Sequence, residues 1–370
     1  GAPDAKIVAY KVLDSGGSGY WSTIIISIDR SVDPNQDGDF SDHLDVISLS
    51  LGSYGDPDDP QSKAIDNAVE AGVVAVVAAG NNGPSEGTIR SPGTARKAIT
   101  VGATDKQDVI ASFSSRGPVT WSNGVIIKPD LVAPGVAICA ARWDGAFSYA
   151  NTRCNNDNNH VAISGTSMAT PHVAGAAALI KQAHSDWMPD EVKMALRNTA
   201  VDIGQPINTQ GYGRIDVLKV IQLNNRPCTA QIHTKGILTG TVDIIGSAYC
   251  TNFYKYNLSY SPLDSLNNPI TIHSSTNQVN NRILYSGFDT TKLNDGEYLL
   301  KLSVTDVFGN SFEENSLIII DYFDLNSVGN HLNYIKGIEE VKGAIRVPGY
   351  TAYKVEYRNE NSSAWLQICY

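Results

Sequence analysis

A serine stands at the start of a predicted helix, where it could act as a nucleophile. Ser167 belongs to a stretch of small residues from Ser164 to Gly175, and the pattern predicts a helix over 167–183. A helix start presents unpaired N–H groups and the positive end of the helix dipole, so the oxyanion formed by serine attack would find a donor there. The alternative is an ordinary helix N-cap, which position alone favours.

Acidic and amide side chains alternate in a second segment, around a glycine at 38. Oxygen ligands at every second position of a turning loop are typical of a calcium site. The usual acidic residue at the twelfth position is absent, because Leu44 stands there, and Asp42 or Asp45 would have to close the shell. The alternative is a solvated turn. The predicted Ca²⁺ ligands are Asp33, Asn35, Asp37, Asp39 and Asp42.

The segment around Ser167 resembles, nearly residue for residue, the nucleophile motif of the subtilisin-like serine proteases (subtilases, peptidase S8 family). Further blocks match that family in its own order, and together they cover about residues 1–223. They are residues 2–14, which resemble the segment after the family's histidine helix, 48–52, its substrate-binding strand, 77–81, the strand that ends in its oxyanion asparagine, 132–135 and 211–215.

This resemblance implies hydrolysis of peptide bonds in polypeptide substrates. Ser167 would be the nucleophile, and Asn81 would donate its side-chain amide to the oxyanion; taken alone, Asn81 is better explained as a turn residue. Two stretches would flank an extended substrate and pair with its backbone. The implied substrate-binding residues are Gly17, Ser18, Gly19, Ser50, Leu51, Gly52, Ala79 and Gly80.

Arg90 aligns with the family segment that lines the pocket for the side chain before the scissile bond. A cation there would favour Glu or Asp in the substrate and disfavour Lys or Arg. The alternative is an exposed loop arginine.

The catalytic base expected by resemblance is absent. The family order is Asp, His, Ser, and no His-Gly-Thr segment occurs in the chain. In the family both partners precede the block at residues 2–6, so we expect them before Gly1, and we expect the 370 residues to be a fragment that is inactive alone. His172 lies five residues after Ser167, where the family also carries a structural histidine.

Hydrophobic patterns predict an α/β unit over residues 1–224. Apolar runs at 6–12, 45–49, 73–78 and 136–140 have strand length, and residues 62–71 have helical spacing. Such alternation predicts a parallel sheet flanked by helices. The resemblance implies the subtilisin-like fold with its N-terminal part missing.

The pattern changes to short alternating strands after residue 224, which predicts an all-β sandwich over 225–325. Residues 288–298 resemble immunoglobulin-like domains attached to secreted enzymes, which space, anchor or bind carbohydrate or protein surfaces. Residues 240–246 resemble 343–349, so we expect a second similar module to start within 326–370, with chance similarity as the alternative.

Composition limits the partners. The net charge of −10 argues against nucleic acid as the main partner, and no run of 18 apolar residues could span a membrane. Cys139 and Cys154, and Cys228 and Cys250, could form local disulfides in an extracellular protein, or all could be free thiols. We therefore expect a secreted serine endopeptidase. The alternatives are a pseudoprotease or an adhesin-like surface binding protein.

Overall fold

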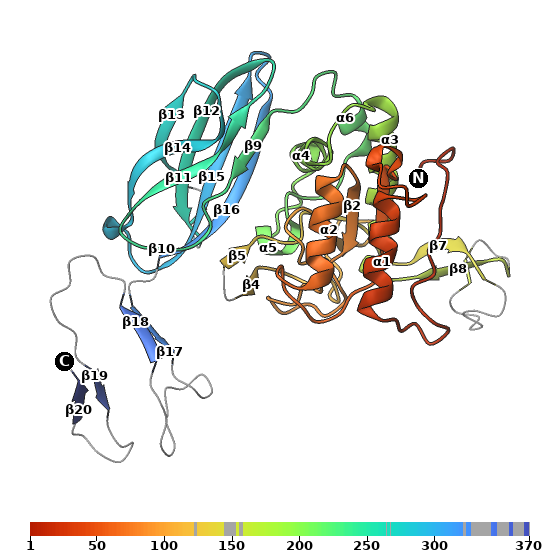
Figure 1. Cartoon of the computed structure of the whole chain (residues 1–370), viewed down its shortest axis with the longest axis horizontal. Coiled ribbons are helices and arrows are strands. Elements are labelled where there is room, and N and C mark those ends of the chain that lie inside the picture. The colour runs from red at the N-terminus through yellow and green to blue at the C-terminus, as the bar shows by residue number, and fades with distance from the viewer. Residues whose placement is uncertain are drawn as a thin grey trace.

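The computed structural model places an α/β unit, residues 1–223, beside a β unit, residues 229–320 (Figure 1). It describes residues 1–121, 124–143, 153–154, 158–263, 265–266 and 268–320, together with the backbone of 323–326, 342–345, 355–357 and 366–369. The predicted α/β architecture, a parallel sheet flanked by helices, is confirmed for the first unit.

The α/β unit is built on a four-stranded parallel sheet with the order β1-β2-β3-β6. Every residue of β2 and β3 is buried, as expected for strands that are covered on both faces. β1 and β2 match two of the predicted apolar runs. The strands are β1 (Val46–Leu49), β2 (Val74–Ala78), β3 (Ile99–Thr104) and β6 (Leu131–Pro134).

Helices cover both faces of this sheet. α1 (Trp21–Val32) and α2 (Pro60–Glu70) share a core with β1 and β2 through Ile28, Ile65 and Val77. On the opposite face α3 (Thr166–Ala183) and α4 (Pro189–Thr199) contribute Val173 and Leu196 to a second core. α3 matches the helix predicted over 167–183.

The prediction of a strand at residues 6–12 is wrong. These residues form no strand, and Ile7 is 90% exposed. An isolated apolar run gains ladder hydrogen bonds only from a neighbouring strand, and no described strand pairs with this one. Apolar composition by itself therefore did not make it a strand.

Short elements connect the main ones. Two disulfides, Cys139–Cys154 in the α/β unit and Cys228–Cys250 in the β unit, confirm the predicted pairs and rule out free thiols at these four positions. The run at 136–140 overlaps a strand, β7, as predicted. The short elements are η1 (Phe40–Asp42), β4 (Val119–Trp121), β5 (Gly124–Ile126), β7 (Ile138–Ala141), β8 (His160–Ile163), α5 (Ile207–Gln210) and α6 (Val217–Ile221).

The β unit consists of a five-stranded sheet, order β10-β16-β15-β12-β13, and a three-stranded sheet, order β14-β11-β9. Ile244, Leu258 and Leu300 belong to its single hydrophobic core. Its β-rich character is as predicted; its relation to immunoglobulin-like domains stays a prediction. The elements are β9 (Thr229–Ile232), β10 (Gly236–Leu238), β11 (Thr241–Tyr249), β12 (Phe253–Pro262), β13 (Ile270–Ser275), β14 (Val279–Asp289), η3 (Thr290–Lys292), β15 (Gly296–Asp306) and β16 (Ser311–Ile320).

The two units contact each other through α4 and β16. Met194 of α4 is part of the hydrophobic core of the β unit, and the Asn198 side chain accepts the backbone N–H of Glu313 at 2.7 Å. Tyr212 Oη likewise accepts the N–H of Asn315 at 2.8 Å. Buried polar and apolar contacts thus join α4 directly to the β unit.

The predicted second module at 326–370 lies mostly outside the described residues. The strands described there and just before it are β17 (Phe323–Asn326), β18 (Lys342–Ile345), β19 (Val355–Tyr357) and β20 (Leu366–Cys369). The division into three domains stays a prediction. Among the described helices, none is both long and apolar enough to cross a bilayer.

Candidate active site

Ser167 is the second residue of α3 and is half-buried. The first backbone N–H groups of a helix have no acceptor within the helix, so the N–H of Ser167 is available beside its own hydroxyl. Neighbouring N–H groups carry the positive end of the helix dipole. The start of α3 can therefore stabilise negative charge that develops next to Ser167 Oγ.

Asn81 is held against the start of α3 by its side-chain oxygen. Asn81 Oδ1 accepts the backbone N–H of Thr166 at 2.9 Å and the hydroxyl of Thr166 at 3.0 Å. The amide nitrogen, Nδ2, donates to no other described residue. Because its oxygen is fixed by Thr166, Asn81 presents a free amide donor at the surface of the site. Its role as an oxyanion ligand stays a prediction.

Ser50, the residue that follows β1, is hydrogen-bonded to the nucleophile. Ser50 Oγ donates to the backbone oxygen of Ser167 at 2.9 Å, and Ser167 Oγ donates to the backbone oxygen of Ser50 at 3.4 Å. Residues far apart in the sequence thus meet where β1 and β2 end and α3 begins. This edge of a parallel sheet is where ligands bind in open α/β folds.

The side chain of Arg90 packs beside both predicted substrate segments. A β-carbon at Gly52 would lie 3.0 Å from Arg90 Cβ, and one at Gly80, where φ is +106°, would lie 2.7 Å from Arg90 Cγ. Arg90 Nε donates to Asn82 Oδ1 at 2.7 Å, and the guanidinium lies 3.6 Å from the ring centroid of Tyr54. The cation is therefore held in one place, next to Gly52 and Gly80.

The remaining predicted substrate residues divide into two groups. Ala79 is buried, and its backbone oxygen accepts the N–H of Arg90 at 2.9 Å, so it belongs to the same site. Gly17, Ser18 and Gly19 lie in an exposed loop that is closed by Asp14. Within the described residues, no hydrogen bond joins this loop to residues 50–52, and the placement of a substrate between the two segments stays a prediction.

No described histidine is hydrogen-bonded to Ser167. His172 Nδ1 interacts with the backbone oxygen of Met168 at 2.8 Å on its own helix, and His184 stacks on Trp187 with ring centroids 4.0 Å apart. Both histidines therefore make local contacts within or next to α3 and do not reach Ser167. A serine hydroxyl without a base is a weak nucleophile at neutral pH.

A groove of about 1360 Å³ runs along α3 next to the nucleophile. Residues 1–13, α1, β1 and α3 line it, and much of this lining is apolar, including Ile28, Leu49 and Leu179. Ser50 and Leu51 also line the groove, which therefore lies next to the hydrogen bond between Ser50 and Ser167.

The acidic loop is folded around its own amides. Asp33 accepts the N–H groups of Gln36 and Gly38 at 2.6 and 3.0 Å, and Asp37 accepts that of Asp39 at 2.8 Å. The backbone N–H of Ser41 lowers the pKa of Asp39. In the described part of the chain, no group of three or more His, Cys, Asp or Glu side chains is arranged to hold a metal ion. The oxygen-rich donor set suits calcium, but these oxygens bind N–H groups of the loop.

Sequence reasoning missed three residues of this site. Thr166 donates a hydrogen bond to the side chain of Asn81, and Asn82 accepts one from Arg90. The ring of Tyr54 packs against the guanidinium of Arg90. The first two are direct neighbours of predicted residues, which is a usable signal. Tyr54 has no such signal, because its contact with Arg90 depends on the fold.

Residues 1–213 match the Subtilase family of peptidases (Peptidase_S8). Serine protease AprX of Bacillus subtilis is 40% identical over 210 residues, 53% of this chain and 47% of AprX. Subtilisin E of the same organism is 38% identical, over 58% of this chain and 48% of that protein. Minor extracellular protease Vpr, also from Bacillus subtilis, is 28% identical, over 60% and 43%. The chain spans about half the length of these relatives.

Proposed function

The chain belongs to the subtilase family, and on this premise we propose that it is part of a secreted serine endopeptidase that hydrolyses peptide bonds through an acyl-enzyme on Ser167. The observation that carries the proposal is the meeting of Ser167, Asn81 and Ser50 at the start of α3. The two disulfides and the extracellular relative support secretion.

The proposed reaction begins with attack of Ser167 Oγ on the substrate carbonyl carbon. The negative charge that forms on the carbonyl oxygen would be stabilised by Asn81 Nδ2 and by the backbone N–H of Ser167. Thr166 contributes by holding Asn81 in place before the substrate arrives. The proposed base would take the Ser167 proton and give it to the leaving amine as the peptide C–N bond breaks, which leaves the acyl-enzyme. Water, deprotonated by the same base, would then attack the ester, release the acid and return the proton to Ser167.

We propose that an Asp and a His from sequence outside these 370 residues supply the base. The absence of a described histidine at Ser167 supports this proposal, as does the apolar groove beside Ser50, which another segment of the protein could fill. The alternatives are a pseudoprotease that only binds peptides and a surface binding protein that acts through its β unit, by contact with carbohydrate or protein. Fluorophosphonate labelling of Ser167 in the extended protein distinguishes the peptidase from both.

We expect Arg90 to select acidic residues immediately before the scissile bond. Its guanidinium is held by Asn82 and Tyr54, so a substrate carboxylate would meet a fixed cation. Arg90→Gln in the active protein should reduce the kcat/KM ratio of Glu over Gln substrates about tenfold, or roughly 1.4 kcal/mol. Peptide-library profiling measures this preference.

Lys106→Gln, an identical change of charge at an exposed loop residue, is the matched control and should leave the profile unchanged. A preference of the unmodified enzyme for basic or large aromatic residues would rule out the assigned role of Arg90.

We also propose that the loop at 33–42 binds Ca²⁺ as a structural ion, through side-chain oxygens of Asp33, Asn35 and Asp37. A ligand that binds only the folded state stabilises it, by about 2.7 kcal/mol at 100 times its dissociation constant. The melting temperature should therefore be higher in calcium chloride than in magnesium chloride at equal concentration. Asp33→Ala should remove the difference, and identical melting curves in calcium and in chelator would contradict the proposal.

A further inference from the structure

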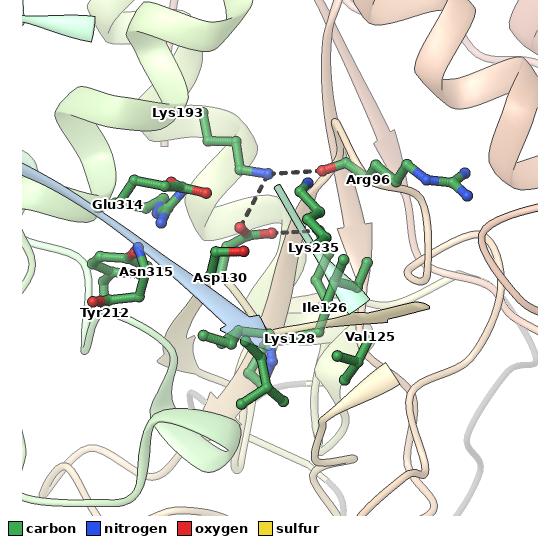
Figure 2. A pocket seen from close by; sticks show the side chains of 15 residues that line it. Arg96, Val125, Ile126, Lys128, Asp130, Lys193, Tyr212, Lys235, Glu314 and Asn315 are labelled. Carbon is green, nitrogen blue, oxygen red and sulfur yellow. Dashed lines mark hydrogen bonds and ion pairs between the residues drawn. The ribbon is translucent and has the colours of Figure 1, made fainter. Parts of the chain in front are cut away.

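A small polar cavity of about 50 Å³ lies between the α/β unit and the β unit (Figure 2). Lys128 and Asp130 come from the segment just before β6, Lys193 and Arg197 come from α4, and the β unit contributes further polar groups. A single water needs about 10–15 Å³, so the cavity has room for a few waters or one small ion. The lining residues from the β unit include Lys235, Glu314 and Asn315.

Positive charge exceeds negative charge in this cavity. Asp130 pairs with Lys128 at 2.7 Å and with Lys193 at 3.0 Å, and all three side chains are nearly inaccessible. Arg197 pairs with Glu314 at 2.7 Å. Lys235 has no described carboxylate within ion-pair distance, whereas the charge of Arg96 is met by Asp58 and Asp66 outside the cavity.

Three cations with little exposure, Lys128, Lys193 and Arg197, therefore face two carboxylates, Asp130 and Glu314. Lys235, which is exposed, adds a fourth cation to the lining. Buried charge without a counter-charge is costly, because neither water nor a partner replaces its hydration. The burial of Lys128 lowers its pKa to about 7, even though Asp130 opposes this shift. Neighbouring Lys193 lowers it further, as expected where positive charge is in excess.

Hydrogen-bond donors are also in excess. An ammonium group has three N–H donors. Lys193 uses its donors on Asp130 and on the backbone oxygens of Arg96 and Ala98, two of which Figure 2 marks. Lys128 binds Asp130 and the oxygen of Ala98, which leaves one donor.

Arg197 supplies another donor. Its side chain is 8% exposed, and Nε is buried with no hydrogen-bond partner among the described residues. A buried donor without an acceptor costs free energy, so an acceptor at this point would be stabilising. Asn315 Oδ1 is the buried acceptor without a partner in this cavity, and it carries no charge to balance the excess.

We propose that this cavity binds a small inorganic anion of the size of chloride, which links the α/β unit to the β unit. The anion would accept from Lys128, from Arg197 Nε and from Lys235, and it would offset the excess charge. Because Lys128 and Arg197 belong to one unit and Lys235 to the other, binding would stabilise the contact between α4 and β16.

The direct test is crystallography of the 370-residue chain grown in sodium bromide. The expected result is an anomalous bromide peak between Lys128, Arg197 and Lys235. Bromide found only at the protein surface, with water in the cavity, would overturn the proposal and would favour a neutral Lys128 instead. A parallel crystal in sodium sulfate tests the size of the site. Sulfate should be absent from the cavity, and sulfate bound there in place of bromide would contradict a site of chloride size.

A second test measures stability in solution. In chloride, compared with isethionate at equal ionic strength, the melting temperature should rise by roughly 5 °C at saturation. Lys235→Met should remove this dependence, and its replacement is compatible with folding because Lys235 is exposed. Lys292→Met, at an exposed lysine of the same unit, is the control and should keep it. Equal chloride dependence in both variants would show that the effect is not local to the cavity.

Discussion

Ser167→Ala should lower kcat by about 10⁶-fold in a protein extended to include the proposed Asp and His, which is the loss known for removal of the nucleophile in a member of this family. The hydroxyl is the only group that the substitution removes, and the proposed acyl-enzyme forms on it. Asn81 and the start of α3 remain, so the variant should still bind peptides. Peptide hydrolysis and fluorophosphonate labelling measure the loss.

Two controls accompany this result. Ser85→Ala, at an exposed loop serine whose side chain makes no described hydrogen bond, should leave both readouts unchanged. The 370-residue chain alone should neither hydrolyse peptides nor label, because no described base reaches Ser167. Robust hydrolysis by that chain would show that the base lies within it and that the proposed division of the site is wrong. An extended protein that carries the Asp and His but does not label would support the pseudoprotease.

Asn81→Asp and Asn81→Ala should each reduce kcat by roughly 10²–10³-fold, the loss known for removal of this donor in a member of the family. The aspartate keeps an oxygen that can accept from Thr166, so the local structure should persist, but it has no N–H to donate. Alanine removes both functions. We expect KM to change little, because the lost interaction forms chiefly in the transition state.

The comparison of these two variants separates catalysis from stability. Asn81→Ala should lower the melting temperature, since the N–H and hydroxyl of Thr166 lose their acceptor, and Asn81→Asp should lower it less. An unchanged kcat in both variants would mean that the oxyanion is stabilised elsewhere. A loss of kcat in the alanine variant alone would assign Asn81 a supporting role.

Local sequence was sufficient to predict elements and motifs whose pattern lies within one short stretch of neighbouring residues. The apolar run at 73–78 predicted β2, because a strand buried on both faces needs apolar residues throughout. The small-residue stretch after Thr166 predicted α3 and placed Ser167 at its start. The motif around Ser167 also carried the family assignment, which residues 1–213 confirm.

The tertiary structure decided which of these segments meet. Ser50 and Ser167 are 117 residues apart, and Asn81 and Thr166 are 85 apart, so only the fold determines these hydrogen bonds. The apolar run at 6–12 shows the opposite case, since it has strand composition but no described partner strand. Apolar composition alone therefore determines neither the burial of a segment nor its partner, since Ile7 in this run is 90% exposed.

The charged cavity could not be predicted from the sequence at all. Lys128, Arg197 and Lys235 belong to no common motif, and each resembles an ordinary surface cation when its sequence neighbours are considered. Their excess of positive charge appears only when the β unit covers α4. Burial and distance set the strength of an electrostatic interaction, and both are properties of the assembled fold.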